Sequence, residues 1–312
     1  MDIFKSKEMK GATFVCMAAA LWGLEGVALI PRLFHFKVPF VVFMVHFIPF
    51  LGMSLLFGRT EIENARKLPK SDLFYFFLVA LFGGALGTLS IVKALFLMDF
   101  HHLTIVTLLQ KLQPVFAILL SRVILGERVG KNFIGWALLA LVGGYFLTFE
   151  FNLPVVINNG NLLKACMLSM FAAFSFGSGT VFGKRALRNA AFRTAVYLRY
   201  TFTTTIMLFI SVYTGSLGEL TSVGREQWAI FLIIGLTSGS GAILLYYYGL
   251  RYIKANVATI CELAFPISSI IFDYVFNGSV LSPIQWISVF LMIGSIYRLS
   301  KNQSQELEVK AA

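Results

Sequence analysis

The chain contains two related stretches, and this duplication constrains its fold more than any single motif. Residues 114–147 align without a gap with residues 266–299, at an offset of 152 positions, so that Pro114 falls on Pro266. A similar register continues towards the N-terminus of each stretch. Nearly the whole chain therefore consists of two copies of one unit. Internal duplication in a strongly apolar chain is typical of secondary transporters.

Apolar residues form long continuous runs along the chain. Hydrophobic residues make up 58% of the sequence and charged residues 13%, whereas soluble domains carry roughly 45–50% and 25%. Each run is close to the ~20 residues that cross a bilayer as a helix, and the absence of alternation argues against barrel strands. We therefore predict an all-α integral membrane protein with ten transmembrane helices. The predicted spans are 11–30, 39–57, 73–95, 103–125, 132–149, 162–183, 195–214, 228–249, 257–276 and 284–299.

Basic residues between the spans are distributed very unequally. If the N-terminus is cytoplasmic, 19 Lys and Arg residues lie on the cytoplasmic side, against three on the other side (Arg32, Lys37 and Arg225). The positive-inside rule then places both termini in the cytoplasm, and we expect a bacterial cytoplasmic (inner) membrane. The net charge of +11 is explained by this topology, so no nucleic-acid partner is predicted.

Each copy of the duplicated unit holds five spans, which is an odd number. The second copy must therefore insert upside down relative to the first. We predict two inverted repeats, residues 11–149 and 162–299, joined by an external connector at 150–161 and followed by a cytoplasmic tail at 300–312. Inverted pairs of this kind hold the substrate near the midplane between the repeats and move it by alternating access.

Several short motifs resemble the EamA-type family of the drug/metabolite transporter superfamily. They are Ala20-Leu21-Trp22-Gly23 in the first span, the proline in the fourth span and Leu125-Gly126-Glu127 at its end. The resemblance covers roughly residues 10–300. It implies ten helices, transport of small organic solutes, and a central cavity lined by spans 1–4 and 6–9, with spans 5 and 10 at the periphery.

The chain departs from the family pattern at positions that matter for substrate choice. His46 stands where the family usually has an arginine near the start of the second span, and its repeat partner is Arg199. Gly278 is followed by Ser279 rather than by glutamate, and Glu25 stands where an uncharged residue is more usual. The family's substrates therefore cannot be transferred to this chain.

Two carboxylates lie inside predicted spans. A charged side chain facing lipid costs at least ~2.5–3.5 kcal/mol, so Glu25 and Glu262 are expected to face the bundle interior. Because burial makes a carboxyl group easier to protonate, either one can couple transport to protons. The alternative for Glu25 is a structural ion pair with a lysine. Lys111 is rotated by about 100° from Gln110 and is expected to face a neighbour such as Glu25 rather than the substrate.

Two mid-span prolines, Pro114 and Pro266, each remove a helical hydrogen bond and are predicted to interrupt the fourth and ninth spans. Gln110 and Gln113 share one face beside Pro114, and Gln110 aligns with Glu262. We predict that these side chains occupy symmetry-related positions in a midplane substrate site. The alternative is that the prolines only bend packed helices.

Three basic candidate residues each have two possible interpretations. Arg199 either binds an anion or extends to the membrane surface. His46 either relays a proton or is a hydrogen-bonded structural residue. Lys93 either meets an acidic substrate group or extends outwards. Tyr200 and Tyr247 are expected to present aromatic faces to the transport path.

Other classes of function lack the residues that they need. Neither a His-x-x-x-His metal motif nor a Gly-x-Ser-x-Gly elbow occurs in the sequence, so we predict no enzyme, no metal and no cofactor. Cys16, Cys166 and Cys261 lie inside spans and are expected to be free thiols. The predicted function is a secondary active transporter of a small organic metabolite or drug, with protons as the candidate coupling ion. Its expected partners are the small-molecule substrate and membrane lipids, and its expected oligomeric state is a monomer or a homodimer. The runner-up is a lipid or lipid-linked carrier.

Overall fold

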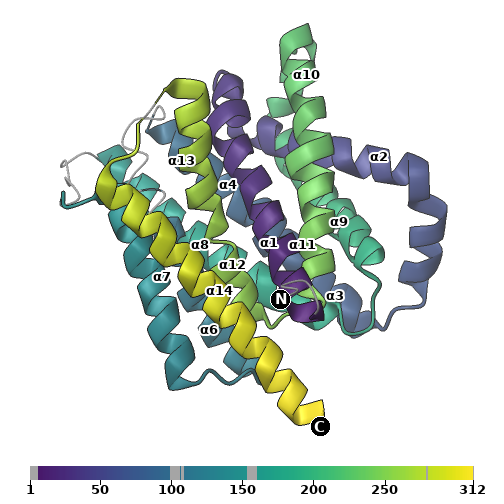
Figure 1. The fold of residues 1–312 in the computed structure, drawn as a ribbon. Helices are drawn as coiled ribbons and strands as arrows, with labels where there is room; N and C mark the ends of the chain where they lie inside the picture. Colours follow the sequence, from purple (N-terminus) through teal and green to yellow (C-terminus); the bar gives the residue numbers. More distant parts are fainter. Residues whose placement is uncertain (1–5, 99–105, 107–108, 153–159, 279, 312) are drawn as a thin grey trace.

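The computed structural model describes residues 6–98, 106, 109–152, 160–278 and 280–311. Every regular element in this part of the chain is a helix, which confirms the predicted all-α class (Figure 1). Eight of the described helical segments are long and apolar enough to cross a membrane. They are Lys7–Leu33, Val38–Arg66, Lys70–Leu97, Lys131–Phe149, Gly160–Ala186, Phe192–Tyr213, Arg225–Leu250 and Ala255–Phe276.

Several spans contain π-helical or 3₁₀ turns between α-helical segments. The first half of the chain comprises α1 (Lys7–Leu24), η1 (Glu25–Leu29), η2 (Ile30–Leu33), α2 (Val38–Arg66), α3 (Lys70–Leu78), η3 (Val79–Leu86), α4 (Gly87–Leu97), α6 (Gln113–Ile124) and α7 (Lys131–Phe149). The second half comprises α8 (Gly160–Ala186), α9 (Phe192–Tyr213), η4 (Ser216–Ser222), α10 (Arg225–Ile234), η5 (Gly235–Gly239), α11 (Ser240–Leu250), α12 (Ala255–Cys261), α13 (Ala264–Asn277) and α14 (Pro283–Ala311).

Three predicted spans differ from the helices that form. The fourth, 103–125, is described only in part, as the shorter helix α6. The second was predicted to end at residue 57, but α2 continues to Arg66, because a helix can leave the apolar layer without unwinding. The tenth continues as α14 through most of the segment predicted as a tail.

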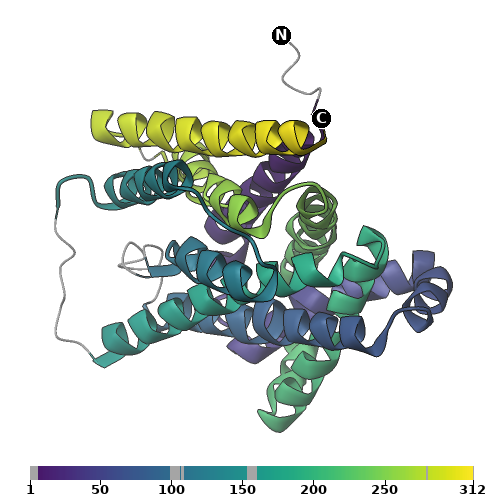
Figure 2. The same ribbon diagram turned by 90° about the horizontal axis from the view of Figure 1, so that it is seen from below.

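Helices from the two halves of the chain are interleaved. Helix α1 packs against α11 and α13, whereas α8 packs against α4 and α6. Helix α2 packs against α9, and α7 packs against α14 at one edge of the bundle (Figures 1 and 2). The first turn of α1 and the last turn of α14 lie on the same side of the molecule, here termed the termini-bearing end (Figures 1 and 2).

Two close helix crossings are related by the duplication. A Cβ atom at Gly23 of α1 would lie 3.0 Å from the carbonyl oxygen of Phe265 in α13. A Cβ atom at Gly177 of α8 would lie 2.9 Å from the carbonyl oxygen of Gln113 in α6. Gln113 and Phe265 are 152 positions apart, which is the offset of the duplication. The absence of a side chain thus lets the same backbone approach occur in both halves.

The helix is interrupted just before each mid-span proline. Residues 111–112 form a turn before α6, and Glu262 and Leu263 separate α12 from α13. Proline cannot donate to the carbonyl one turn earlier, so each interruption leaves backbone groups without their helical partners. The two interruptions lie close together, because α6 and α12 are in contact.

Candidate functional site

The carboxylate of Glu262 is the centre of a polar cluster formed where the interrupted helices meet. Its Oε2 accepts a hydrogen bond from Gln113 Nε2 at 2.6 Å. Its Oε1 accepts from the Tyr246 hydroxyl at 2.9 Å and from the Thr180 hydroxyl at 3.2 Å. The hydroxyls of Thr180 and Tyr246 also lie 2.6 Å apart, and because each carries one proton, a hydroxyl that donates to the other does not donate to the carboxylate at the same time. These four residues, the Glu262 cluster, join α6, α8 and α11 to the end of α12.

The members of the Glu262 cluster differ in exposure. Gln113, Thr180 and Tyr246 are 9%, 4% and 3% exposed, whereas Glu262 itself is only half-buried. A carboxylate offers about four lone-pair positions, and the three donors do not use all of them. The Glu262 carboxylate can therefore accept a further hydrogen bond from a bound molecule.

An aromatic face lies beside this cluster. The Trp22 ring is 5.5 Å from the Tyr246 ring, with 51° between the ring planes. Trp22 Nε1 donates to the backbone oxygen of Ser238 at 3.1 Å, which fixes the indole. Trp22 and Glu25 are half-buried and three residues apart, at the junction of α1 and the π-helical turn η1. The Trp22 ring therefore lies beside the Glu262 cluster, and the carboxylate of Glu25 follows it by three residues along the chain.

The basic candidates His46 and Arg199 occupy a second group of contacts, on α2 and α9. Arg199 Nη2 donates to the Gly83 carbonyl oxygen at 2.9 Å, and its guanidinium lies 5.9 Å from the Tyr247 ring centroid. His46 Nδ1 lies 2.8 Å from the carbonyl oxygen one turn earlier, and its ring is 5.9 Å from that of Tyr200. Arg199 is therefore directed into the bundle rather than towards the membrane surface.

Lys111 does not face Glu25, so this part of the sequence prediction is wrong. Its Nζ donates to the Gly144 carbonyl oxygen at 3.2 Å and also to the Thr148 hydroxyl, both on α7. The rotation of about 100° holds for a regular helix, but the turn at residues 111–112 changes the direction of the side chain. Lys111 faces a neighbouring helix, as expected, but that helix is α7.

The two predicted glutamines have different positions. Gln113, not Gln110, supplies the hydrogen bond to Glu262, although Gln110 is the residue that aligns with Glu262. Gln110 is half-buried beside the interruption. Lys93 is exposed on α4 and does not belong to the Glu262 cluster.

Sequence reasoning missed two members of the cluster. Tyr246 was passed over for Tyr247, since at most two of three consecutive tyrosines can face one path and their order gives no preference. Thr180 is an uncharged residue in an apolar span and carries no sequence signal of its own. Both are recognised only because they contact the Glu262 carboxylate.

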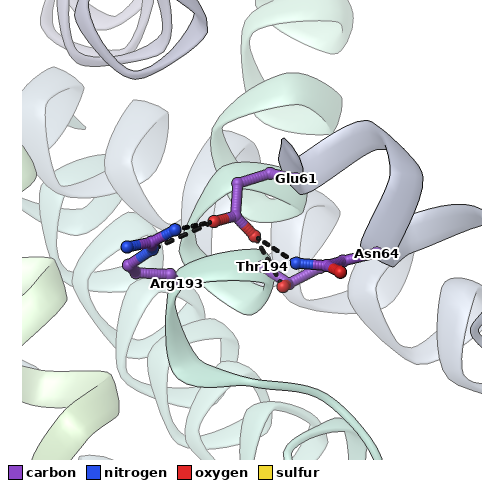
Figure 3. Close-up of polar contacts among 4 residues, drawn as sticks. All are labelled: Glu61, Asn64, Arg193 and Thr194. Atoms are coloured by element: carbon purple, nitrogen blue, oxygen red, sulfur yellow. Dashed lines mark hydrogen bonds and ion pairs between the residues drawn. The ribbon is translucent and has the colours of Figure 1, made fainter. Parts of the chain in front are cut away.

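A further carboxylate, that of Glu61, is fully buried and joins α2 to α9 (Figure 3). Glu61, only 1% exposed, accepts hydrogen bonds from Arg193 Nε and Nη2 at 3.0 and 2.8 Å and from the Thr194 hydroxyl at 2.7 Å. Asn64 Nδ2 adds a longer contact of 3.4 Å. Because the second span was predicted to end at residue 57, this contact between helices was not anticipated.

No group of His, Cys, Asp and Glu in the described part of the chain has the arrangement needed to hold a metal ion. The three cysteines are free thiols. The chemistry available at the centre is therefore hydrogen bonding, aromatic stacking and proton binding by carboxylates.

Comparisons with known proteins agree with the fold. The model of the EamA-like transporter family matches residues 9–149 and 163–301. The chain is 60% identical, over 94% of its length and 98% of the relative's, to the riboflavin transporter ImpX of Fusobacterium nucleatum subsp. nucleatum. A solved crystal structure with 16% identity superimposes with a TM-score of 0.70 over 94% of this chain and 98% of the other. The predicted resemblance is confirmed, the protein is an integral membrane transporter and not an enzyme, and the chain belongs to the EamA-like transporter family.

Proposed function

We propose that this protein carries riboflavin across the bacterial cytoplasmic membrane by alternating access between two inverted repeats, residues 11–149 and 162–299. The observation that carries the proposal is the 60% identity to a riboflavin transporter over nearly the full length of both chains. The recurrence of the α1–α13 crossing as the α8–α6 crossing, at the offset of the duplication, supports the repeat organisation.

The chemistry of the Glu262 cluster suits a neutral flavin. Riboflavin joins a flat aromatic ring system, edged with hydrogen-bond donors and acceptors, to a chain of hydroxyl groups. A half-buried carboxylate accepts hydrogen bonds from such hydroxyl or ring N–H groups, and Trp22 offers a face for stacking. In this proposal Glu262 and Gln113 hold the polar edge of the flavin while Trp22 contacts its ring.

The same carboxylates are the candidates for proton coupling. Glu262 holds three donors within hydrogen-bond distance, and a proton on its carboxyl group would remove an acceptor from that set. Protonation and flavin binding therefore compete for the same oxygens. Glu25 is the second candidate, and His46 becomes the candidate if neither carboxylate couples.

Proteoliposomes containing single variants test the binding role. Glu262→Ala and Gln113→Ala should each weaken riboflavin uptake while membrane abundance stays normal. A hydrogen bond to a charged group contributes about 1.5–3 kcal/mol, which corresponds to about 10–100-fold in affinity. Glu63→Gln, at an exposed position of α2, is the matched control and should transport normally. Unchanged uptake in both cluster variants would place the flavin elsewhere.

Glu→Gln variants separate coupling from binding, because a glutamine mimics a permanently protonated acid. Glu262→Gln or Glu25→Gln should abolish proton-driven accumulation of riboflavin yet preserve exchange of labelled for unlabelled riboflavin. Full accumulation in both variants would exclude these carboxylates as coupling residues. Loss of exchange as well would indicate a role in flavin binding only.

The proposed orientation has the termini-bearing end in the cytoplasm, which the unequal distribution of basic residues supports. In a variant lacking Cys16, Cys166 and Cys261, a cysteine at the exposed Thr221 should react with an impermeant thiol reagent from outside intact cells. A cysteine at the exposed Ala191 should not. Labelling of the Ala191 position from outside would reverse the orientation.

A lipid carrier is the second candidate, and one feature favours it. An apolar surface groove of about 580 Å³ lies between the α6 region and α8 and includes Met167 and Phe171, which are 60% and 40% exposed. The groove is lined by Leu109, Phe116, Cys166, Met167, Met170, Phe171 and Phe174. Phospholipid scrambling by proteoliposomes that fail to bind riboflavin would favour the lipid carrier over the flavin transporter.

A further inference from the structure

The turn that joins α11 to α12 at the termini-bearing end is held on both sides by charged residues of other helices. Glu127, which follows α6, accepts hydrogen bonds from the backbone N–H groups of Ala255 and Asn256 at 2.9 and 3.2 Å. Lys184 Nζ, on α8, donates to the backbone oxygens of Leu250 and Arg251 at 2.8 and 3.1 Å. The carboxylate thus meets the positive start of α12, and the ammonium meets the negative end of α11.

Local geometry explains why Glu127 reaches this turn. Helix α6 ends at Ile124, and Gly126 adopts φ +70°, a conformation that other residues rarely take. This lets the Glu127 N–H bond back to the Ser121 carbonyl oxygen at 3.2 Å, so the chain turns sharply and directs the Glu127 side chain towards α12. The Gly-Glu pair therefore positions the Glu127 carboxylate at the start of α12.

The contacts of Glu127 and Lys184 form a second layer of polar contacts, about one helical turn away from the Glu262 cluster. Thr180 and Lys184 lie one helical turn apart on α8, and Tyr246 and Leu250 lie one turn apart on α11. Both layers join the same helices: side chains from α6 or its C-terminal turn and from α8 hold α11 and α12. One end of the α11–α12 hairpin carries Tyr246 and Glu262, and the other end is held by the charged pair.

We propose that Glu127 and Lys184 form a clamp that closes the termini-bearing end of the transport path, and that each transport cycle requires the clamp to release the α11–α12 turn. This inference rests on the proposed alternating access but not on the identity of the substrate. Release moves the hairpin away from α6 and α8, which opens a route from that end to the Glu262 cluster.

Cysteine accessibility at Ala255 tests the clamp without any substrate. Ala255 is fully buried and clusters with Ala117 of α6 and Val181 of α8, so it lies within the contact that must open. In a variant lacking the native cysteines, Ala255→Cys should react slowly with an impermeant maleimide applied from the termini-bearing side in membrane vesicles. Adding Lys184→Met or Glu127→Gln should accelerate this reaction about tenfold or more.

Two controls make the result specific. Lys184→Arg retains the donors and should react as slowly as the parent, and Glu63→Gln, on an exposed part of α2, should have no effect. Unchanged Ala255→Cys labelling in both Lys184→Met and Glu127→Gln would overturn the proposal. The labelling reaction needs no riboflavin. It therefore tests the clamp even if riboflavin is not the substrate of this protein.

Cross-linking gives an independent measurement, because a covalent link between the same two positions replaces the contact instead of weakening it. A thiol-reactive cross-linker joining Glu127→Cys to Asn256→Cys should stop transport of the substrate, and a cleavable linker should restore it on reduction. Riboflavin binding should persist in the cross-linked protein, because the cluster residues are untouched. Full transport by cross-linked protein would show that the turn need not be released.

Discussion

The two interrupted spans have the same backbone plan but carry different side chains. In both, the helix breaks just before a proline, and the segment after the break packs against a glycine of another span. The break in the first half carries Gln113, a donor, whereas the break in the second half carries Glu262, an acceptor. The aligned partners of these residues are Phe265 and Gln110, and the phenylalanine side chain has no group with which to form the corresponding hydrogen bond.

The difference shows which property the duplication preserved and which it left free to change. The glycines of the two close approaches, Gly23 and Gly177, are 154 positions apart, and the backbone oxygens that they face are 152 positions apart, so both approaches belong to the duplicated unit. The side chains at the interruptions are free to diverge, because polar partners can come from any helix that lies near. A symmetric scaffold therefore holds an asymmetric site, with one carboxylate at its centre.

The largest expected effect tests the symmetry of the scaffold. Gly23→Leu and Gly177→Leu should each destabilise the protein by about 3 kcal/mol, because a side chain would collide with backbone atoms of the crossing helix. Thermal unfolding in detergent and membrane abundance measure the loss. Gly135→Leu is the control, since a Cβ there meets no atom within 4 Å. A large effect at only one of the two glycines would mean that the halves do not rely on the same contact.

Exchanging the two polar side chains tests the asymmetry of the site. Gln113→Glu alone should impair folding or transport, since two carboxylates would face each other. The double variant Gln113→Glu/Glu262→Gln restores a donor–acceptor pair and should regain stability. Riboflavin uptake should still fall about 10–100-fold, because the carboxylate no longer faces Tyr246 and Thr180. Full uptake by the double variant would show that only the pair matters.

A smaller effect is expected for a contact that exists in one half only. Lys111 binds the Gly144 oxygen and Thr148, whereas its counterpart in the second half is the apolar Leu263. The partners of Lys111 are neutral, and the Thr148 hydroxyl also donates to the Gly144 oxygen, so Lys111→Leu leaves neither of them unpaired and should change stability by less than about 1 kcal/mol. Thermal unfolding measures the change. A loss of several kcal/mol, or loss of transport at normal stability, would assign Lys111 a role that its second-half counterpart cannot have.

The smallest effect sets the background for these differences. Arg59 and Glu63 form an exposed i,i+4 ion pair of 3.5 Å on the extension of α2. Glu63→Gln should change stability by less than about 0.5 kcal/mol, since water and salt screen such pairs. Thermal unfolding at low and high salt measures it. A larger change in stability would mean that an exposed ion pair contributes as much as the Lys111 contact, so the two effects could not be told apart.

The sequence alone determined the class of the protein. The apolar runs predicted helices that cross a membrane, because only helices and closed barrels satisfy the backbone there and the runs do not alternate as barrel strands do. The ordered motifs around Trp22, Pro114 and Gly126 predicted the family, which the comparisons confirm. These signals depend on composition and spacing, and both are read directly from the chain.

Tertiary structure decided which side chains meet. Helical geometry places Gln110 and Gln113 on one face, but only the interruption before α6 determines that Gln113 reaches Glu262 and that Lys111 turns to α7. Tyr246 and Thr180 join the site because α11 and α8 cross beside α12. Contacts between residues distant in the sequence depend on the angles at which helices bend and cross. Those angles are set by the packing of the whole bundle, so local periodicity cannot supply them.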